Sequence, residues 1–110
     1  MLDEDRLRLH HMLEAAEDVL TFIEGHEQTE LDQNRMLLLA IVKSIEIIGE
    51  AASRVSDELR DATPQIPWRQ IVATRNRLIH GYFDINTRIV WNTVSQEIPQ
   101  LIVPLKALLR

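Results

Sequence analysis

The sequence predicts an all-α protein built as an antiparallel bundle of four helices. Three glycines and four prolines among 110 residues leave few positions that break a helix. Apolar residues make up 45% of the chain, which is enough for one continuous core. They recur at steps of three and four, the spacing of one helix face. We therefore expect a single soluble helical domain spanning residues 1–110.

The first two predicted helices are defined by their apolar stripes. The first runs from about Asp3 to Glu24, and Gly25 ends it. Its stripe is Leu9, Leu13, Ala16, Leu20 and Ile23. The second and longest runs from about Asp32 to Arg60 and forms the centre of the core. Its stripe is Ile41, Ile45, Ile48, Ala52, Val55 and Leu59.

Gly49 lies in the middle of the long predicted helix. A glycine there costs about 1 kcal/mol relative to alanine. A second stripe on this helix would allow another helix to approach closely, and it consists of Ala40, Ser44, Ile47 and Ala51. We therefore expect either close helix packing or a site at Gly49.

The third predicted helix runs from about Pro67 to His80. Proline suits the first turn of a helix, because it has no N–H to leave unpaired there. Gly81 follows at the position of a left-handed C-terminal cap. The face of this helix is apolar except for one residue, Arg75, and its stripe is Trp68, Val72, Arg75 and Ile79.

The last predicted helix is interrupted by two prolines. Asp84 or Asn86 can cap its start. Pro99 and Pro104 each remove one backbone hydrogen bond, so a kink or two shorter helices is expected rather than a straight rod. Its apolar stripe is Val90, Val94, Ile98, Leu101, Leu105 and Leu108.

Composition and charge exclude several classes of function. The absence of cysteine excludes disulfides, thiolate zinc sites and a cysteine nucleophile. The N-terminus lacks an apolar signal core, and the run MLLLAIV at 36–42 is too short to span a bilayer, so a cytoplasmic location is expected. The net charge is −5, but residues 69–88 form a basic island with four arginines and one acid.

The histidines near the N-terminus do not predict a metal site. His10 and His11 are adjacent, so their side chains point about 100° apart on a helix. No ligand partner shares a face with both, and His26 stands alone in a loop. We expect neither a metal nor another cofactor.

Glu46 and Glu50 lie one turn apart on the long predicted helix, with Lys43 and Arg54 within a turn of either. They could be a catalytic carboxylate pair, a polar lining at a helix interface, or a solvated face with ion pairs along the helix. The spacing alone leaves these alternatives open.

Arg75 and His80 are the remaining candidates for chemistry. An arginine on an apolar face needs a partner or a water-filled cleft, because it stays charged. Asn76 and His80 share a face one turn apart, whereas Arg75 and His80 converge only if the helix end is frayed. A histidine that moves a proton beside a guanidinium that stabilises a phosphorane suits metal-independent RNA cleavage. The alternative is a buried structural arginine with a capping histidine.

The stretch RNRLIHGY at 75–82 fits the R-x4-6-H signature of HEPN domains. Its continuation, R-x4-H-x-Y, resembles the HepT toxins of HepT/MntA toxin–antitoxin pairs. The stretches RLRLHHMLEAAEDVLTFIEG at 6–25 and IEIIGEAASRVS at 45–56 also resemble this family. The resemblance implies a HEPN-type helical bundle and a homodimer whose two motifs face one cleft.

The resemblance also implies residue roles. Arg75 and His80 would be catalytic, and Asn76 would be a polar neighbour within the motif. Tyr82 would be the residue that an MntA-like nucleotidyltransferase antitoxin adenylylates. The function expected is an endoribonuclease toxin acting on RNA, with transfer RNA favoured by the family likeness. The alternatives are a noncatalytic helical module that binds a nucleotidyltransferase, and a purely structural dimer.

Overall fold

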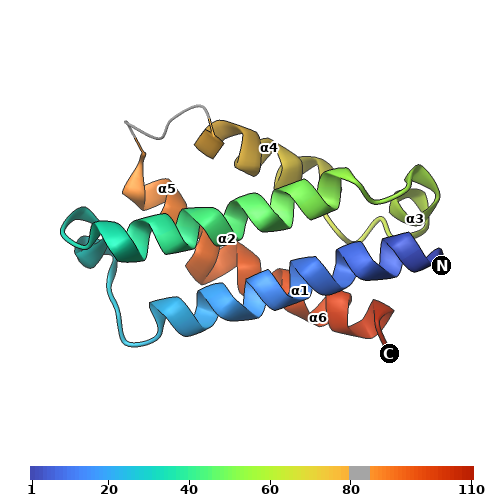
Figure 1. Ribbon diagram of the computed structural model, residues 1–110, viewed down its shortest axis with the longest axis horizontal. Helices are drawn as coiled ribbons and strands as arrows, with labels where there is room; N and C mark the ends of the chain where they lie inside the picture. The colour runs from blue at the N-terminus through green and yellow to red at the C-terminus, as the bar shows by residue number, and fades with distance from the viewer. Residues whose placement is uncertain (80–84) are drawn as a thin grey trace.

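The computed structural model describes residues 1–79 and 85–110, and all regular structure within them is helical. Four helical stretches run in alternating directions along the long axis of the molecule (Figure 1). They are α1 (Asp3–Ile23), α2 (Arg35–Ser53), α4 (Trp68–Ile79) and a last stretch made of α5 (Thr87–Asn92), η2 (Thr93–Glu97) and α6 (Ile98–Leu108). Short helices occupy two connections, η1 (Gln28–Asp32) and α3 (Asp57–Ala62). The expected all-α bundle is confirmed.

Helix α2 lies at the centre of the bundle and packs most extensively against α1 and α4. The expected stripe of α2 is buried, with Ile41 fully inaccessible to solvent. The last stretch closes the core from behind α1 and α2 in Figure 1 and contributes the buried side chains of Val90, Val94, Ile98, Leu101 and Leu105. No helix in the described part of the chain is long and apolar enough to cross a membrane.

The long helix expected from Asp32 to Arg60 is shorter in the structure. It begins at Arg35, because the side chain of Asn34 accepts a hydrogen bond from the backbone of the first turn. It ends at Ser53, and a separate helix, α3, follows. The prediction was wrong here because the apolar spacing continues through the break, where Val55 and Leu59 are both buried.

The break between α2 and α3 is held by Ser56 and Asp5. Ser56 caps α3, since its Oγ accepts from the backbone N–H of Leu59 at 3.2 Å. The carboxylate of Asp5 in α1 accepts from the backbone N–H of Ser56 at 2.9 Å and from its hydroxyl at 2.6 Å. Asp5 is only 4% exposed. The first turn of α1 is thereby tied to the start of α3.

The other predicted helix ends can be compared directly. Gly25 has a φ of +78°, a conformation that favours glycine, and lies just beyond the end of α1. Asn86 rather than Asp84 provides a cap for α5, because its Oδ1 accepts from the N–H groups of Arg88 and Ile89. Asp84 and the expected cap at Gly81 lie outside the described residues.

The last helical stretch is interrupted as expected. A π-helical turn, η2, precedes α6, and a proline occupies the first turn of α6. Pro99 therefore lies where its missing N–H costs least. Pro104 lies inside α6. The expectation of two shorter helices is confirmed.

We predict that Asp5→Ala lowers the free energy of unfolding by about 2–4 kcal/mol, because two hydrogen bonds to a buried carboxylate are lost. Urea unfolding at fixed protein concentration measures the effect. Asp3→Ala is the matched control, since Asp3 is an exposed acid in the same turn of α1. Equal changes in the two variants would contradict the role of the Asp5–Ser56 contact.

Candidate functional site at Arg75

Arg75 projects from α4 onto α2 at Gly49. A Cβ atom placed on Gly49 would lie 2.2 Å from Cβ of Arg75 and 2.6 Å from its Cγ. No side chain can occupy position 49 without displacing the stem of the arginine. We expected either close packing or a site to explain a glycine within the long helix. The structure confirms close packing, because α2 and α4 approach each other closely at Gly49.

The guanidinium of Arg75 is held by two side chains. Its Nη2 donates to Oε2 of Glu50 at 2.8 Å, and its Nη1 donates to Oδ1 of Asn76 at 3.1 Å. The side chain of Arg75 remains 26% exposed. Its Nε is buried without a hydrogen-bond partner among the described residues. The arginine on the apolar face thus has the charged partner that the sequence required, and it still reaches solvent.

Glu50 is shared between two arginines. Its second oxygen, Oε1, accepts from Nε of Arg54 at 2.9 Å, and Nη2 of Arg54 lies 2.9 Å from the same oxygen. Because each carboxylate oxygen is held by a different arginine, the orientation of the carboxylate is fixed. One negative charge between two guanidinium groups leaves the local charge positive. Glu50 therefore orients Arg75 without neutralising the surroundings.

A hollow of about 300 Å³ opens beside Arg75, between α1 and α2. Four Arg and Lys side chains line it together with two glutamates, and its lining is Arg8, His11, Lys43, Glu46, Ile47, Glu50, Ala51, Arg54 and Arg75. Glu46 is 15% exposed, and Lys43 lies 3.9 Å from its Oε2. The hollow has the charge and size to accept a phosphate group.

The contacts of Glu46 and Glu50 in the structure bear on the alternative roles that the sequence left open for them. Both line the hollow, and both form the ion pairs along α2 that their spacing allows. Glu50 also bonds to α4, a contact that spacing within one helix cannot reveal. Arg8 and His11 were not identified as site residues, because their i, i+3 spacing gives a shared face but not the helix that it faces.

The other candidate site residues either do not line this hollow or lie outside the residues that the structure describes. His10 is exposed on α1, and His26 pairs with Glu30 one turn further along the chain. Within residues 1–79 and 85–110, no three His, Asp or Glu side chains gather as a metal site would require. His80 and Tyr82 lie outside the described residues.

Comparison with known proteins decides the family. The family model described as "Ribonuclease HepT-like" matches residues 12–108. The chain belongs to the HepT-like ribonuclease family. The expected kinship with HEPN-type RNases is therefore confirmed, and with it the expectation of an RNA-cleaving enzyme.

Several relatives of this HepT-like chain are named as RNases. A candidate RNase of Methanocaldococcus jannaschii is 36% identical over 84% of this chain and 85% of its own length. A candidate RNase of Caldanaerobacter subterraneus subsp. tengcongensis is 36% identical over 93% of this chain and 91% of its own length. A "Probable ribonuclease HepT" of Thermococcus cleftensis is 40% identical over 56% of each chain. No solved structure gives a significant match.

We predict that Gly49→Ala destabilises the protein by about 1–3 kcal/mol, because the added methyl group overlaps the stem of Arg75. Alanine has the higher helix propensity, so propensity alone would predict the opposite sign. Urea unfolding of a double-mutant cycle with Arg75→Gly separates the two effects, because only glycine also removes the Cβ that the new methyl group would meet. In the Arg75→Gly background, Gly49→Ala should be neutral or stabilising. Destabilisation of equal size in both backgrounds would contradict the contact.

Proposed function

We propose that this HepT-like protein is a metal-independent endoribonuclease in which Arg75 and His80 act on one phosphodiester of RNA. The observation that carries the proposal is the state of Arg75. Its guanidinium is oriented by Glu50, is partly exposed, and lines a hollow in which basic side chains outnumber acidic ones. A fixed cation at that place suits the stabilisation of charge that develops on a phosphate.

The proposed reaction is an internal transfer. The 2′-hydroxyl of the RNA loses its proton and attacks the adjacent phosphorus, and the bond to the 5′-oxygen of the next nucleotide breaks. The products are a 2′,3′-cyclic phosphate and a 5′-hydroxyl that receives a proton. His80 would serve as the general acid or base. Asn76 would help to orient Arg75, to which it is hydrogen-bonded.

We predict that Arg75→Ala and His80→Ala each lower the rate of RNA cleavage in EDTA by about 10²-fold or more. His10→Ala is the matched control for His80, because His10 is exposed on α1 and does not line the hollow. Replacement of the attacking 2′-hydroxyl by hydrogen should abolish cleavage. Retained activity in both motif variants would reject Arg75 and His80 as the catalytic pair. Wild-type protein that does not cleave RNA would favour the alternative, a noncatalytic module that binds a nucleotidyltransferase.

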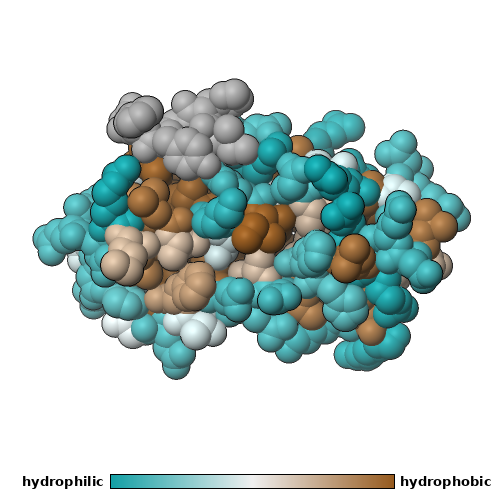
Figure 2. Space-filling model, in the orientation of Figure 1, coloured by the Kyte–Doolittle hydropathy of each residue, from teal (hydrophilic) through white to brown (hydrophobic). Residues whose placement is uncertain are grey.

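A second copy of the chain would complete the site. Met36, Leu39 and Ile47 are exposed hydrophobic residues on one face of α2, and Glu50 and Arg54 continue that face. Figure 2 shows hydrophobic surface gathered over the half of the molecule where α2 begins. An apolar stripe that leads directly to Arg75 supports a two-fold homodimer that brings two such sites together.

We predict that Met36→Glu weakens dimerisation by at least tenfold, because it places a charge in the apolar contact. Sedimentation equilibrium at micromolar concentrations measures the effect. Val103→Glu is the control, since Val103 is also strongly exposed but lies on α6. A wild-type protein that is monomeric and fully active would overturn the dimer.

The proposed regulation is adenylylation of Tyr82 by a nucleotidyltransferase antitoxin. The HepT-like family and the position of Tyr82, two residues after His80, support this assignment. Added AMP would bring negative phosphate into the field of Arg75 and Arg77 and compete with the RNA backbone. Transfer RNA is the substrate that we propose, and the pair would form a toxin–antitoxin system in the cytoplasm.

We predict that Tyr82→Phe, co-expressed with a cognate nucleotidyltransferase, gains no AMP mass and remains toxic. Intact-mass spectrometry and growth assays measure the two effects. Wild-type protein in the same cells should gain AMP and lose toxicity. Adenylylation and neutralisation of the variant would show that the modified residue is another one.

A further inference from the structure

A second hollow with basic side chains lies on the opposite flank of α4 from Arg75. It has a volume of about 360 Å³ and is lined by Arg77, Arg88, Ile89, Asn92, Thr93 and Glu97. Arg77 comes from the last turn of α4, and the other residues come from α5 and η2. The hollow therefore lies between α4 and the last helical stretch, whereas the hollow at Arg75 lies between α1 and α2.

Helix geometry explains why two nearby arginines line different hollows. Residues two apart on an α-helix are rotated by about 200°. Arg75 faces Gly49 and Glu50 of α2, so Arg77 faces away from α2. A helix with its side chains is about 10–12 Å across. Arg75 and Arg77 thus point to different sides of α4 and line different hollows, so each is placed for a different phosphate.

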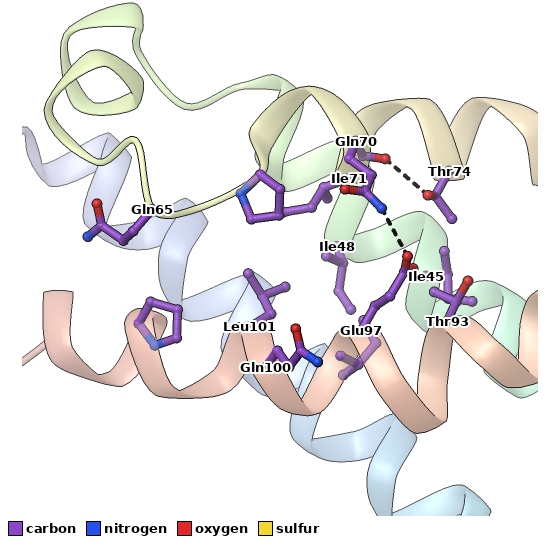
Figure 3. Close-up of a pocket in the computed structure, with 13 residues that line it drawn as sticks. Ile45, Ile48, Gln65, Gln70, Ile71, Thr74, Thr93, Glu97, Gln100 and Leu101 are labelled. Atoms are coloured by element: carbon purple, nitrogen blue, oxygen red, sulfur yellow. Dashed lines mark hydrogen bonds between the residues drawn. The ribbon is translucent and has the colours of Figure 1, made fainter.

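The arginines of the second hollow are available to a ligand. Arg77 and Arg88 are both exposed, and neither forms an ion pair with a described residue. The acid that lines this hollow, Glu97, accepts a hydrogen bond at 2.9 Å from the side-chain amide of Gln70. Figure 3 shows this bond between two of the residues that line a neighbouring, largely apolar pocket. Glu97 therefore has a neutral partner, and the two arginines outweigh its single negative charge in the lining of the hollow.

Helix stability explains only one of the two arginines. Arg77 in the last turn of α4 complements the negative end of the helix dipole. Arg88 lies in the first turn of α5, where the dipole favours an anion instead. Its backbone N–H is already bonded to the cap, Asn86. The placement of Arg88 beside Arg77 is better explained by a shared anionic ligand.

We infer that Arg77 and Arg88 bind a backbone phosphate of the RNA at a position other than the cleaved phosphodiester. Asn92, exposed on the same wall, supplies a side-chain amide that can donate to the same phosphate or to a ribose. This inference rests on the proposed ribonuclease function, because the ligand is the same RNA strand. The second hollow is a binding subsite, and Arg75 and His80 remain the groups at the reacting phosphate.

The test uses full-length protein and a single-stranded RNA oligonucleotide with 2′-O-methyl groups, which can bind but cannot be cleaved. Arg77→Gln and Arg88→Gln should each weaken binding by roughly tenfold. Each should also reduce the slope of log affinity against log salt by about 0.7, the value for one lost phosphate contact on a single strand. Arg77→Lys keeps the charge and should retain most of the slope.

Arg69→Gln is the matched control, because it removes the same charge from the exposed first turn of α4 and does not line the hollow. With cleavable RNA, Arg77→Gln and Arg88→Gln should raise KM and leave kcat nearly unchanged. Unchanged slopes, or equal losses in Arg69→Gln, would overturn the subsite. If wild-type protein binds RNA but does not cleave it, the proposed function is rejected. The salt slopes of the variants would then still test the subsite. Wild-type protein that does not bind RNA would overturn both.

Discussion

The contact between Arg75 and α2 is the constraint on which the rest of the structure depends. Helices α2 and α4 pack along apolar faces, and an arginine stands within one of them. A charge at such a place is costly unless it is paired. Gly49 provides room for the aliphatic stem, and the next residue, Glu50, provides the carboxylate. Two successive residues of α2 therefore accommodate the aliphatic stem of this arginine and pair with its guanidinium group.

The way in which Arg75 is paired keeps the site receptive to an anion. Had Glu50 bound Arg75 alone, the pair would be neutral overall. Because Arg54 binds the other oxygen of the same carboxylate, a net positive charge remains at the mouth of the hollow. The structural requirement of α2–α4 packing and the proposed binding of phosphate are thus satisfied by the same three side chains.

The sequence predicts the fold better than the site, for physical reasons. Apolar spacing places the bundle helices correctly, because burial of one face is what stabilises each of them. The same spacing conceals the break after Ser53, since Val55 and Leu59 remain buried beyond it. The signal that was available is Ser56 followed by two acids, which is typical of a helix start.

The sequence predicts only those features of the candidate site that depend on residues close to one another in the chain. The charge of Arg75 on an apolar face requires a partner, and the motif itself contains Asn76. The identity of the partner depends on which residue of α2 lies opposite, and that is a property of helix packing. The same is true of Arg8 and His11, which reach the hollow from α1. Neither belongs to a motif, so packing alone reveals them.

The acidity of the chain is compatible with a polyanionic substrate. Charges interact over about 8 Å at physiological salt, so a phosphate responds to the side chains nearest to it rather than to the net charge of −5. Arg and Lys outnumber Glu by four to two in the hollow at Arg75 and by two to one in the hollow at Arg77. Elsewhere an acidic surface repels RNA. The net negative charge of the chain then favours RNA binding along the two basic flanks of α4 over nonspecific coating of the surface. Such localised binding is a condition for cleavage at a defined position.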